Sequence, residues 1–136
     1  MKFIVDLTTN NQFLQIVGLT ETNEQFCQPF AFQVRGHGTL AETILDALRA
    51  AVARTEEIDR LYHTDSEARA AFDGGETHLY QGGVPVVTLL RMRMITLFVG
   101  SHSVTTLTNL KDAAKLIKAF EKAIAKAFEK AIAKAN

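Results

Sequence analysis

Residues 2–35 carry the patterns of β-strands. Two β-rich runs, residues 2–8 and 12–19, flank a polar turn at residues 9–11, which predicts a hairpin. A third run places four apolar side chains on one face of an extended strand: Phe26, Phe30, Phe32 and Val34. Pro29 cannot donate a hydrogen bond to a neighbouring strand, so this third strand is predicted to lie at a sheet edge.

The pattern then changes to the period of a helix. Residues 39–42 (TLAE) have the Ser/Thr-x-x-Glu spacing of a capping box, which predicts that a helix begins at Thr39. Its apolar stripe comprises Leu40, Ile44, Leu45, Leu48, Ala51 and Val52. Near His63 the sequence leaves two interpretations open: the helix continues, or Asp65 and Ser66 cap a separate short helix that ends at Gly74-Gly75.

Strand patterning returns after this helical region. Residues 78–81 and 84–90 flank the Gly82-Gly83 pair, which predicts a second hairpin. The strand pattern continues to Val99, beyond the usual length of about three to ten residues, so we expect a bulge or bend near residues 91–93. A last strand is predicted at residues 104–107.

Residues 111–136 are predicted to form one long amphipathic helix, capped by Asn109 with Asp112. The octapeptide AFEKAIAK occurs at residues 119–126 and again at 127–134, and most of its residues are strong helix formers. An identical duplication of this kind is uncommon in natural globular chains. We interpret it as a sign of design, fusion or generated sequence.

The predicted C-terminal helix is long relative to the rest of the chain. It would span about 39 Å, whereas a compact body of ~110 residues has a radius of gyration near 13 Å. We therefore expect its last turns to overhang and to contact a second copy, a groove of another protein or an anionic membrane surface, with self-association as the leading interpretation. The expected partner-binding residues are Phe120, Ile124, Phe128 and Ile132. The alternative is that the whole apolar stripe packs on the body.

Charge divides the chain at the same place. Residues 111–136 carry seven Lys against three acidic groups, and residues 1–110 carry eight basic against twelve acidic groups, although the formal net charge is zero. No apolar run reaches the roughly 18 residues of a membrane-spanning helix, and the N-terminus lacks a signal-peptide pattern. We therefore expect a soluble cytoplasmic protein, in which the single Cys27 forms no internal disulfide.

The strongest candidate for a ligand site is the glycine-rich turn before the first helix. Free N–H groups and the helix dipole favour an anion there, and the predicted anion-binding residues are Gly36, His37, Gly38 and Thr39. The turn lacks the Lys of a nucleotide-binding P-loop, so a plain strand-to-helix connection is the competing interpretation.

Other groups with reactive side chains have no diagnostic spacing. A metal or acid–base site could be assembled from His63 and Asp65, with Glu67, Asp73, Glu76 and His78 further along, although no two histidines have the i, i+4 spacing of helical zinc ligands. Solvated loop groups are the competing interpretation. Arg91 and Arg93 could form a basic patch for nucleic acid, or could protect a sheet from aggregation. We therefore assign no catalytic residue, no cofactor-binding residue, no metal ligand and no cofactor.

Two short segments resemble antitoxin families. Three strands followed by residues 38–42 (GTLAE) and an Ala/Leu helix resemble HicB-type antitoxins. Residues 75–77 (GET) and 83–86 (GVPV) are similar to the hairpin of Phd-type antitoxins, with a spacing that differs by one. Each resemblance covers less than a quarter of the chain and they point to different families, so no family is assigned. Both imply a small protein that acts by occupying a partner.

Together the patterns predict an α+β fold, in which an antiparallel sheet of about 5–7 strands is covered on one face by helices. Residues 1–110 would form the body, and helix 111–136 would pack on it within a single domain. We expect a non-catalytic binding or regulatory protein that acts through protein–protein interaction, such as an antitoxin, a phage-type inhibitor or a designed protein. The alternatives are a small enzyme that uses His63 or His37 and a nucleic-acid-binding module.

Overall fold

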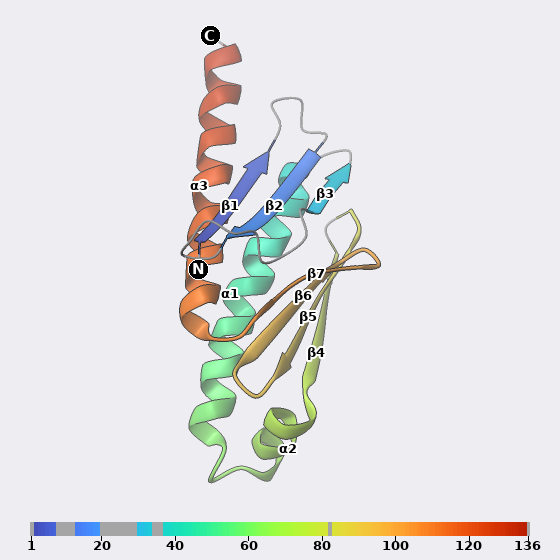
Figure 1. Cartoon of the computed structure of the whole chain (residues 1–136), viewed down its shortest axis with the longest axis vertical. Coiled ribbons are helices and arrows are strands. Elements are labelled where there is room, and N and C mark those ends of the chain that lie inside the picture. The colour runs from blue at the N-terminus through green and yellow to red at the C-terminus, as the bar shows by residue number, and fades with distance from the viewer. Residues whose placement is uncertain (1, 8–12, 20–29, 34–36, 82, 136) are drawn as a thin grey trace.

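The computed structural model describes residues 2–7, 13–19, 30–33, 37–81 and 83–135, and Figure 1 shows their arrangement. The elements are β1 (Lys2–Leu7), β2 (Phe13–Leu19), β3 (Phe30–Gln33), α1 (His37–Leu61), α2 (Ser66–Gly74), β4 (Glu76–Gln81), β5 (Pro85–Arg91), β6 (Met94–Val99), β7 (His102–Leu107) and α3 (Leu110–Ala135). The fold is α+β, as predicted, and its last element is the long C-terminal helix.

The strands form two antiparallel sheets, with orders β1-β2-β3 and β4-β5-β6-β7. The prediction of one sheet with five to seven strands was therefore wrong, and the larger sheet has four. Strands joined by short turns pair with their neighbours in sequence, and the helical segment α1–α2 separates the two groups. β3 lies at an edge of the smaller sheet, as Pro29 predicted, although residues 26–29 themselves lie outside the described part of the chain.

A tight turn, rather than the expected bulge, interrupts the long strand pattern near residues 91–93. Arg91 pairs with Met94, and Met92 adopts a φ of 57° while its N–H donates to the carbonyl of Phe72 in α2 at 2.8 Å. This two-residue turn reverses the chain and changes which positions share a face. Val86, Thr88 and Leu90 now face inward with Ile95, Leu97 and Val99.

Local capping chemistry determines most helix ends. Asp65 accepts a hydrogen bond from the N–H of Glu67 at 2.9 Å and begins α2, so the interpretation with two separate helices is confirmed. Asn109 accepts from the N–H of Asp112 at 2.8 Å and begins α3 as predicted. α1 instead begins at His37, so Thr39 lies inside the helix and the prediction that Thr39 caps it was wrong. None of the helices in the described residues combines the length and hydropathy needed to cross a membrane.

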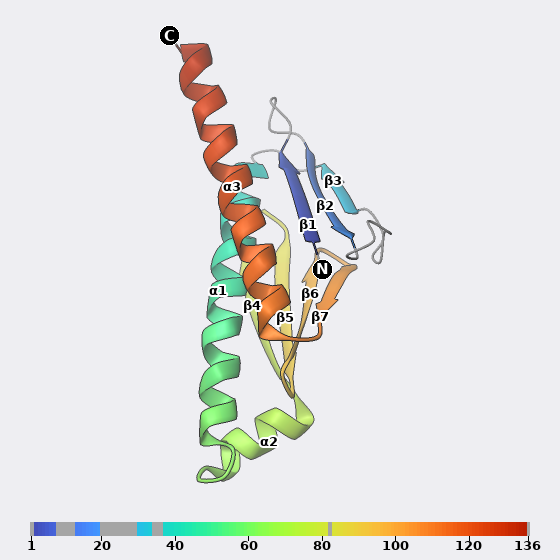
Figure 2. The same cartoon turned by 60° about the vertical axis from the view of Figure 1, so that its left-hand side comes forward.

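α1 and α3 pack side by side, and Figure 2 shows both on the same side of the two sheets. α1 contacts β5 and the smaller sheet's β2, while α3 contacts β1 and β7. The largest fully buried side chains are Leu40, Ile44, Leu48, Leu90, Ile95, Leu97, Leu107, Leu116 and Phe120. These residues belong to one buried cluster that also includes Phe3 and Leu7 of β1. The C-terminal helix therefore contributes side chains to the same core as both sheets.

Candidate functional site

The structure places the predicted partner-binding residues of α3 in different environments. Phe120 has no exposed surface and belongs to the core, and Ile124 is partly buried against it. Phe120 is therefore part of this chain's own packing rather than of a surface for a partner. Phe128 and Ile132 lie on the helix, but their side chains are outside the described part, so their predicted role stays a prediction.

The predicted anion-binding residues lie at the start of α1. His37, Gly38 and Thr39 form its first turn, which contains no acidic residue, and Gly36 is outside the described part. The side chains of these three residues are also not described. Anion binding at this turn therefore stays a prediction.

The two arginines of the predicted basic patch both have partners within the chain. Arg93 donates from Nε to Oδ1 of Asp59 in α1 at 3.1 Å. Arg91 donates from Nε to the carbonyl of Asp73 in α2 at 3.3 Å. These contacts tie the β5–β6 turn to the two helices. Each guanidinium keeps further N–H donors, so these contacts give the arginines a local role and leave nucleic-acid binding at this patch a prediction.

His63 lies on the surface after α1. Its ring packs edge-to-face on Tyr62 with centroids 5.1 Å apart, and Arg69 lies over the Tyr62 ring at 5.9 Å from its centroid. Among the described residues, no three His, Cys, Asp or Glu side chains come together as metal ligands would. The structure thus surrounds His63 with an aromatic ring and an arginine, and brings no acid–base partner to it in the described part.

A polar cluster joins α1 to the edge strand β4 and contains two of the sequence candidates, Glu76 and His78. Two guanidinium nitrogens of Arg54 donate to the carboxylate of Glu76, Nε to Oε1 at 2.9 Å and Nη2 to Oε2 at 3.0 Å. Arg54 also contacts Glu57, and His78 Nε2 shares a hydrogen bond with Oε1 of Glu76. The period of two along β4 could have shown that Glu76 and His78 share a face. Nothing in the sequence indicated Arg54, which is 22 residues away on another element.

The electrostatics of this cluster favour a structural role. The hydrogen bond from Arg54 holds the pKa of Glu76 below its usual value, with a smaller contribution from His78, while burial acts in the opposite direction. Glu76 in turn raises the pKa of Arg54. A carboxylate that stays ionised and already accepts from two side chains is a poor proton carrier at neutral pH. The pairing of Arg54 with Glu76, here called the latch, therefore ties α1 to β4.

Replacing Glu76 with Gln should lower the free energy of unfolding by about 1–2 kcal/mol at pH 7, because the bidentate ionic hydrogen bonds are lost. The folded pKa of Glu76 is depressed. The ionised carboxylate of Glu76 thus stabilises the fold fully at pH values above about 4.3, its pKa in the unfolded chain. This stabilisation is lost as the pH falls through the lower pKa that Glu76 has in the folded chain. Urea unfolding followed by circular dichroism should show the full difference at pH 7 and a difference that shrinks as the pH is lowered below about 4.

Glu57→Gln is the matched control for the latch, because Glu57 contacts the same arginine from a side chain that is 49% exposed. Its expected cost is below about 0.5 kcal/mol. Equal losses for the two variants, or a loss for Glu76→Gln that does not shrink with falling pH below about 4, would contradict the assignment of the latch to Arg54 and Glu76.

A second feature is the face of the four-stranded sheet that points away from the buried cluster, here called the outer face. Its first central cross-strand row comprises Leu79, Val87, Phe98 and Ser103. Its second comprises Thr77, Leu89, Thr96 and Thr106. Neither row contains a charged side chain. The sequence did not predict this face, because treating β5 and β6 as one strand placed Val87 and Leu89 with the core-facing Ile95 and Leu97.

The outer face is accessible as well as uncharged. Leu79 is 62% exposed, more than any other large hydrophobic side chain in the described part of the chain. Val87 and Phe98, its neighbours in the row, are only partly buried, and so is Leu89. A large aliphatic side chain on an edge strand, next to other apolar groups and without charges, is typical of a protein-binding surface.

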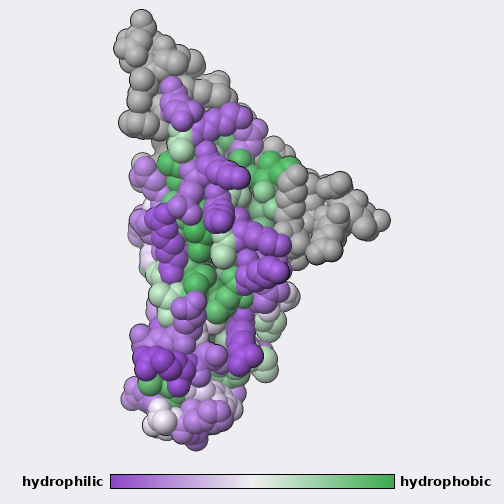
Figure 3. Space-filling model, turned by 90° about the vertical axis from the view of Figure 1, so that its left-hand side faces the viewer, coloured by the Kyte–Doolittle hydropathy of each residue, from purple (hydrophilic) through white to green (hydrophobic). Residues whose placement is uncertain are grey.

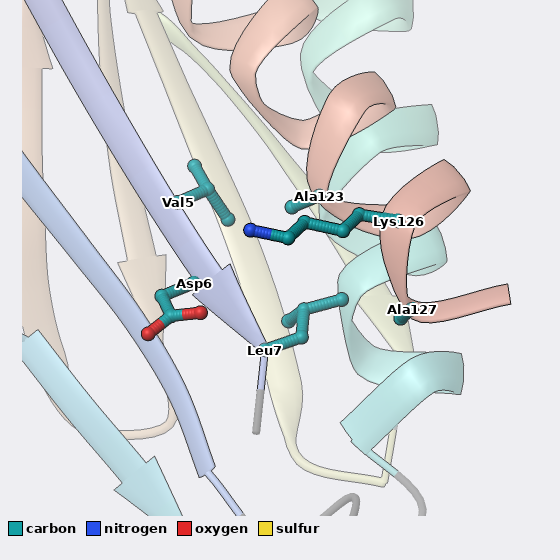
Figure 4. A pocket seen from close by; sticks show the side chains of 6 residues that line it. All are labelled: Val5, Asp6, Leu7, Ala123, Lys126 and Ala127. Carbon is teal, nitrogen blue, oxygen red and sulfur yellow. The ribbon is translucent and has the colours of Figure 1, made fainter. Parts of the chain in front are cut away.

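A small cavity lies between β1 and α3, lined by Val5, Asp6, Leu7, Ala123, Lys126 and Ala127 (Figure 4). Its volume is about 50 Å³. Pockets for organic ligands usually measure about 300–1,000 Å³, whereas one water occupies roughly 30 Å³. The cavity therefore has room for water and not for a substrate or cofactor.

Comparisons with protein-family models, with curated proteins and with solved structures give no match for this chain. The two antitoxin-like segments gain no support from them. The outer face and the latch are therefore interpreted from their own geometry, and the outer face is the better candidate for function because its residues are accessible and have no role in holding the described helices together.

Proposed function

We propose that this chain is a non-catalytic protein that works through protein–protein contacts, and that the outer face of the four-stranded sheet is its binding surface. The observation that carries the proposal is the exposed Leu79, in register with Val87 and Phe98, within two rows that contain no charge. Burying apolar surface favours association by about 25 cal/mol per Å² before the costs of binding. A contact on this face would therefore gain free energy without desolvating an ion.

A second copy of the chain is the occupant that the chemistry favours. Two outer faces packed on each other would bury apolar and hydroxyl groups against the same groups, and no unpaired charge would be enclosed. The chain has a formal net charge of zero at pH 7, so two copies do not repel each other as ions. Face-to-face packing of two antiparallel sheets is also a common arrangement, with a core about 10 Å thick.

The last turns of α3 are proposed as a second region for protein–protein contact. Phe128 and Ile132 would contact a partner chain separately from the outer face, as their positions near the end of a long helix first suggested. A regulatory protein that occupies its partner, in the way of an antitoxin or phage-type inhibitor, is the wider form of this proposal, whether the chain is natural or designed.

Leu79→Lys tests the proposal by placing a charge in the first row of the outer face, on the edge strand β4. A side chain that is already 62% exposed can be replaced with little effect on folding. Light scattering over a concentration series should show that the unmodified chain associates, and that the Lys variant stays a monomer because burying its ammonium group is unfavourable.

Ile4→Lys is the matched control, because Ile4 is a 45% exposed aliphatic residue on the other sheet. This variant should associate like the unmodified chain. Association of Leu79→Lys with unchanged strength, or an equal loss in Ile4→Lys, would show that the outer face is not the binding surface.

A further inference from the structure

The solvent side of α3 carries a row of lysines, here called the lysine stripe. Its members are Lys111, Lys115, Lys118, Lys122 and Lys126, and all five are exposed. At about 100° per residue they fall within roughly 80° of the helix circumference, and at 1.5 Å per residue they extend over about 22 Å. Figure 3 looks onto the side where α3 and α1 lie, and shows hydrophilic side chains flanking a band of hydrophobic ones. The stripe is thus a straight, regular row of positive charge.

None of the five lysines forms an ion pair in the described part of the chain, although Lys126 shares the lining of the cavity between β1 and α3 with Asp6. The ion pairs found there all use Arg or His as the cation. Of the acidic residues on α3, Glu121 pairs with Arg49 of α1 at 3.2 Å, and Asp112 is bound to Asn109 at the helix cap. Glu129, one turn beyond Lys126, is the remaining acidic residue and is exposed. Four positive charges or more therefore remain uncompensated.

The spacing of these lysines is unfavourable for the helix itself. Each is three or four residues from the next, and like charges at these separations destabilise a helix. A helix that needed lysines only for solubility would be more stable with alternating Glu and Lys. The arrangement therefore favours an external anion that relieves the repulsion.

We propose that the lysine stripe binds the phosphate backbone of double-stranded nucleic acid, independently of sequence. A rigid row of ammonium groups suits a rigid row of phosphates, because each contact releases condensed counterions. Lysine acts as a point charge, and the stripe contains no Arg, Asn or Gln that could read base edges. This activity goes beyond self-association and uses a different surface.

Two other anionic partners fit the structure less well. A membrane-binding helix inserts its apolar side between lipids, but the apolar side of α3 is buried in the core through Leu116, Phe120 and Ala123. Single-stranded nucleic acid is usually bound by aromatic side chains that stack on bases, and the stripe contains none. A duplex requires neither insertion nor stacking.

Fluorescence anisotropy with labelled duplex DNA and duplex RNA of unrelated sequences tests the proposal on the full chain. The logarithm of the binding constant should fall with the logarithm of salt concentration, with a slope near −4 for about four to five neutralised phosphates. Lys115→Gln with Lys122→Gln should reduce the slope by about two and weaken binding to every sequence. Arg60→Gln, which removes an exposed basic group from α1, is the matched control and should leave the slope unchanged.

The outcomes separate clearly. Absence of duplex binding at about 50 mM salt, or a slope that the double lysine variant leaves unchanged, would overturn the proposal. So would binding to vesicles that contain phosphatidylserine without binding to either duplex. Parallel measurements on Leu79→Lys distinguish this proposal from self-association, because that variant should bind nucleic acid through the stripe even as a monomer.

Discussion

Replacing Phe120 with Ala is expected to lower the free energy of unfolding by about 3–5 kcal/mol. Phe120 has no exposed surface, and it lies in one buried cluster with residues of α1, β1 and the four-stranded sheet. Its removal takes a large apolar side chain out of the core and leaves a cavity that the surrounding elements fill only in part. Urea unfolding followed by circular dichroism measures the loss.

Phe128→Ala is the matched control, because both phenylalanines occupy the same position of the repeated octapeptide. Eight residues advance a helix by about 80° beyond two full turns, so the two copies cannot point in the same direction. We expect a loss below about 1 kcal/mol for Phe128→Ala. Losses of similar size at the two positions would mean that the repeat packs as a uniform stripe, against the present description.

Ending the chain at residue 118 is expected to abolish stable folding. The shortened chain would lack Phe120 and Ala123, which are both buried in the common core. The loss should exceed that of Phe120→Ala, and typical domains have only about 5–15 kcal/mol in total. Thermal unfolding by circular dichroism should show no cooperative transition near the temperature found for the full chain.

A chain that ends at residue 128 provides the comparison. It keeps the described buried residues of α3, namely Asp112, Ala113, Leu116, Phe120 and Ala123. We expect its midpoint of thermal unfolding to stay within a few degrees of that of the full chain. A cooperative, stable fold for residues 1–118 would show instead that the C-terminal helix is an appendage and not part of the core.

The sequence predicted the features that depend on neighbouring residues. Asp65 begins α2 and Asn109 begins α3 because a side-chain oxygen accepts from an N–H two or three residues later. The β4–β5 hairpin and the long C-terminal helix follow from turn residues and helix formers in the same way. These signals are local, and tertiary packing does not change them.

The sequence alone did not predict features that depend on contacts between residues far apart in the chain. Leu90 and Ile95 lie on the same face of the sheet only because the chain reverses at Met92. Residues 91–93 contain no Gly or Pro, so the sequence did not indicate a turn there. The latch needs Arg54 and Glu76 from two elements. The division into two sheets depends on which strands pair with each other. Alternating apolar and polar residues identify a strand but do not show to which sheet it belongs.

The two proposed surfaces lie on opposite sides of the molecule. α1 and α3 lie together on one side of the sheets in Figure 2, whereas the outer face is the opposite face of the four-stranded sheet from the core that contacts α1. Two chains joined through their outer faces would therefore carry their lysine stripes on the outside.

Sedimentation equilibrium of the unmodified full chain tests self-association most directly, since it measures mass without a label or a substitution. One chain has a mass of 15.0 kDa. The account predicts an apparent mass that rises with concentration toward twice this value and stays there, as expected for two outer faces that cover each other. A constant mass of one chain up to about millimolar concentration, where even a binding energy of about 4 kcal/mol would be visible, would contradict it.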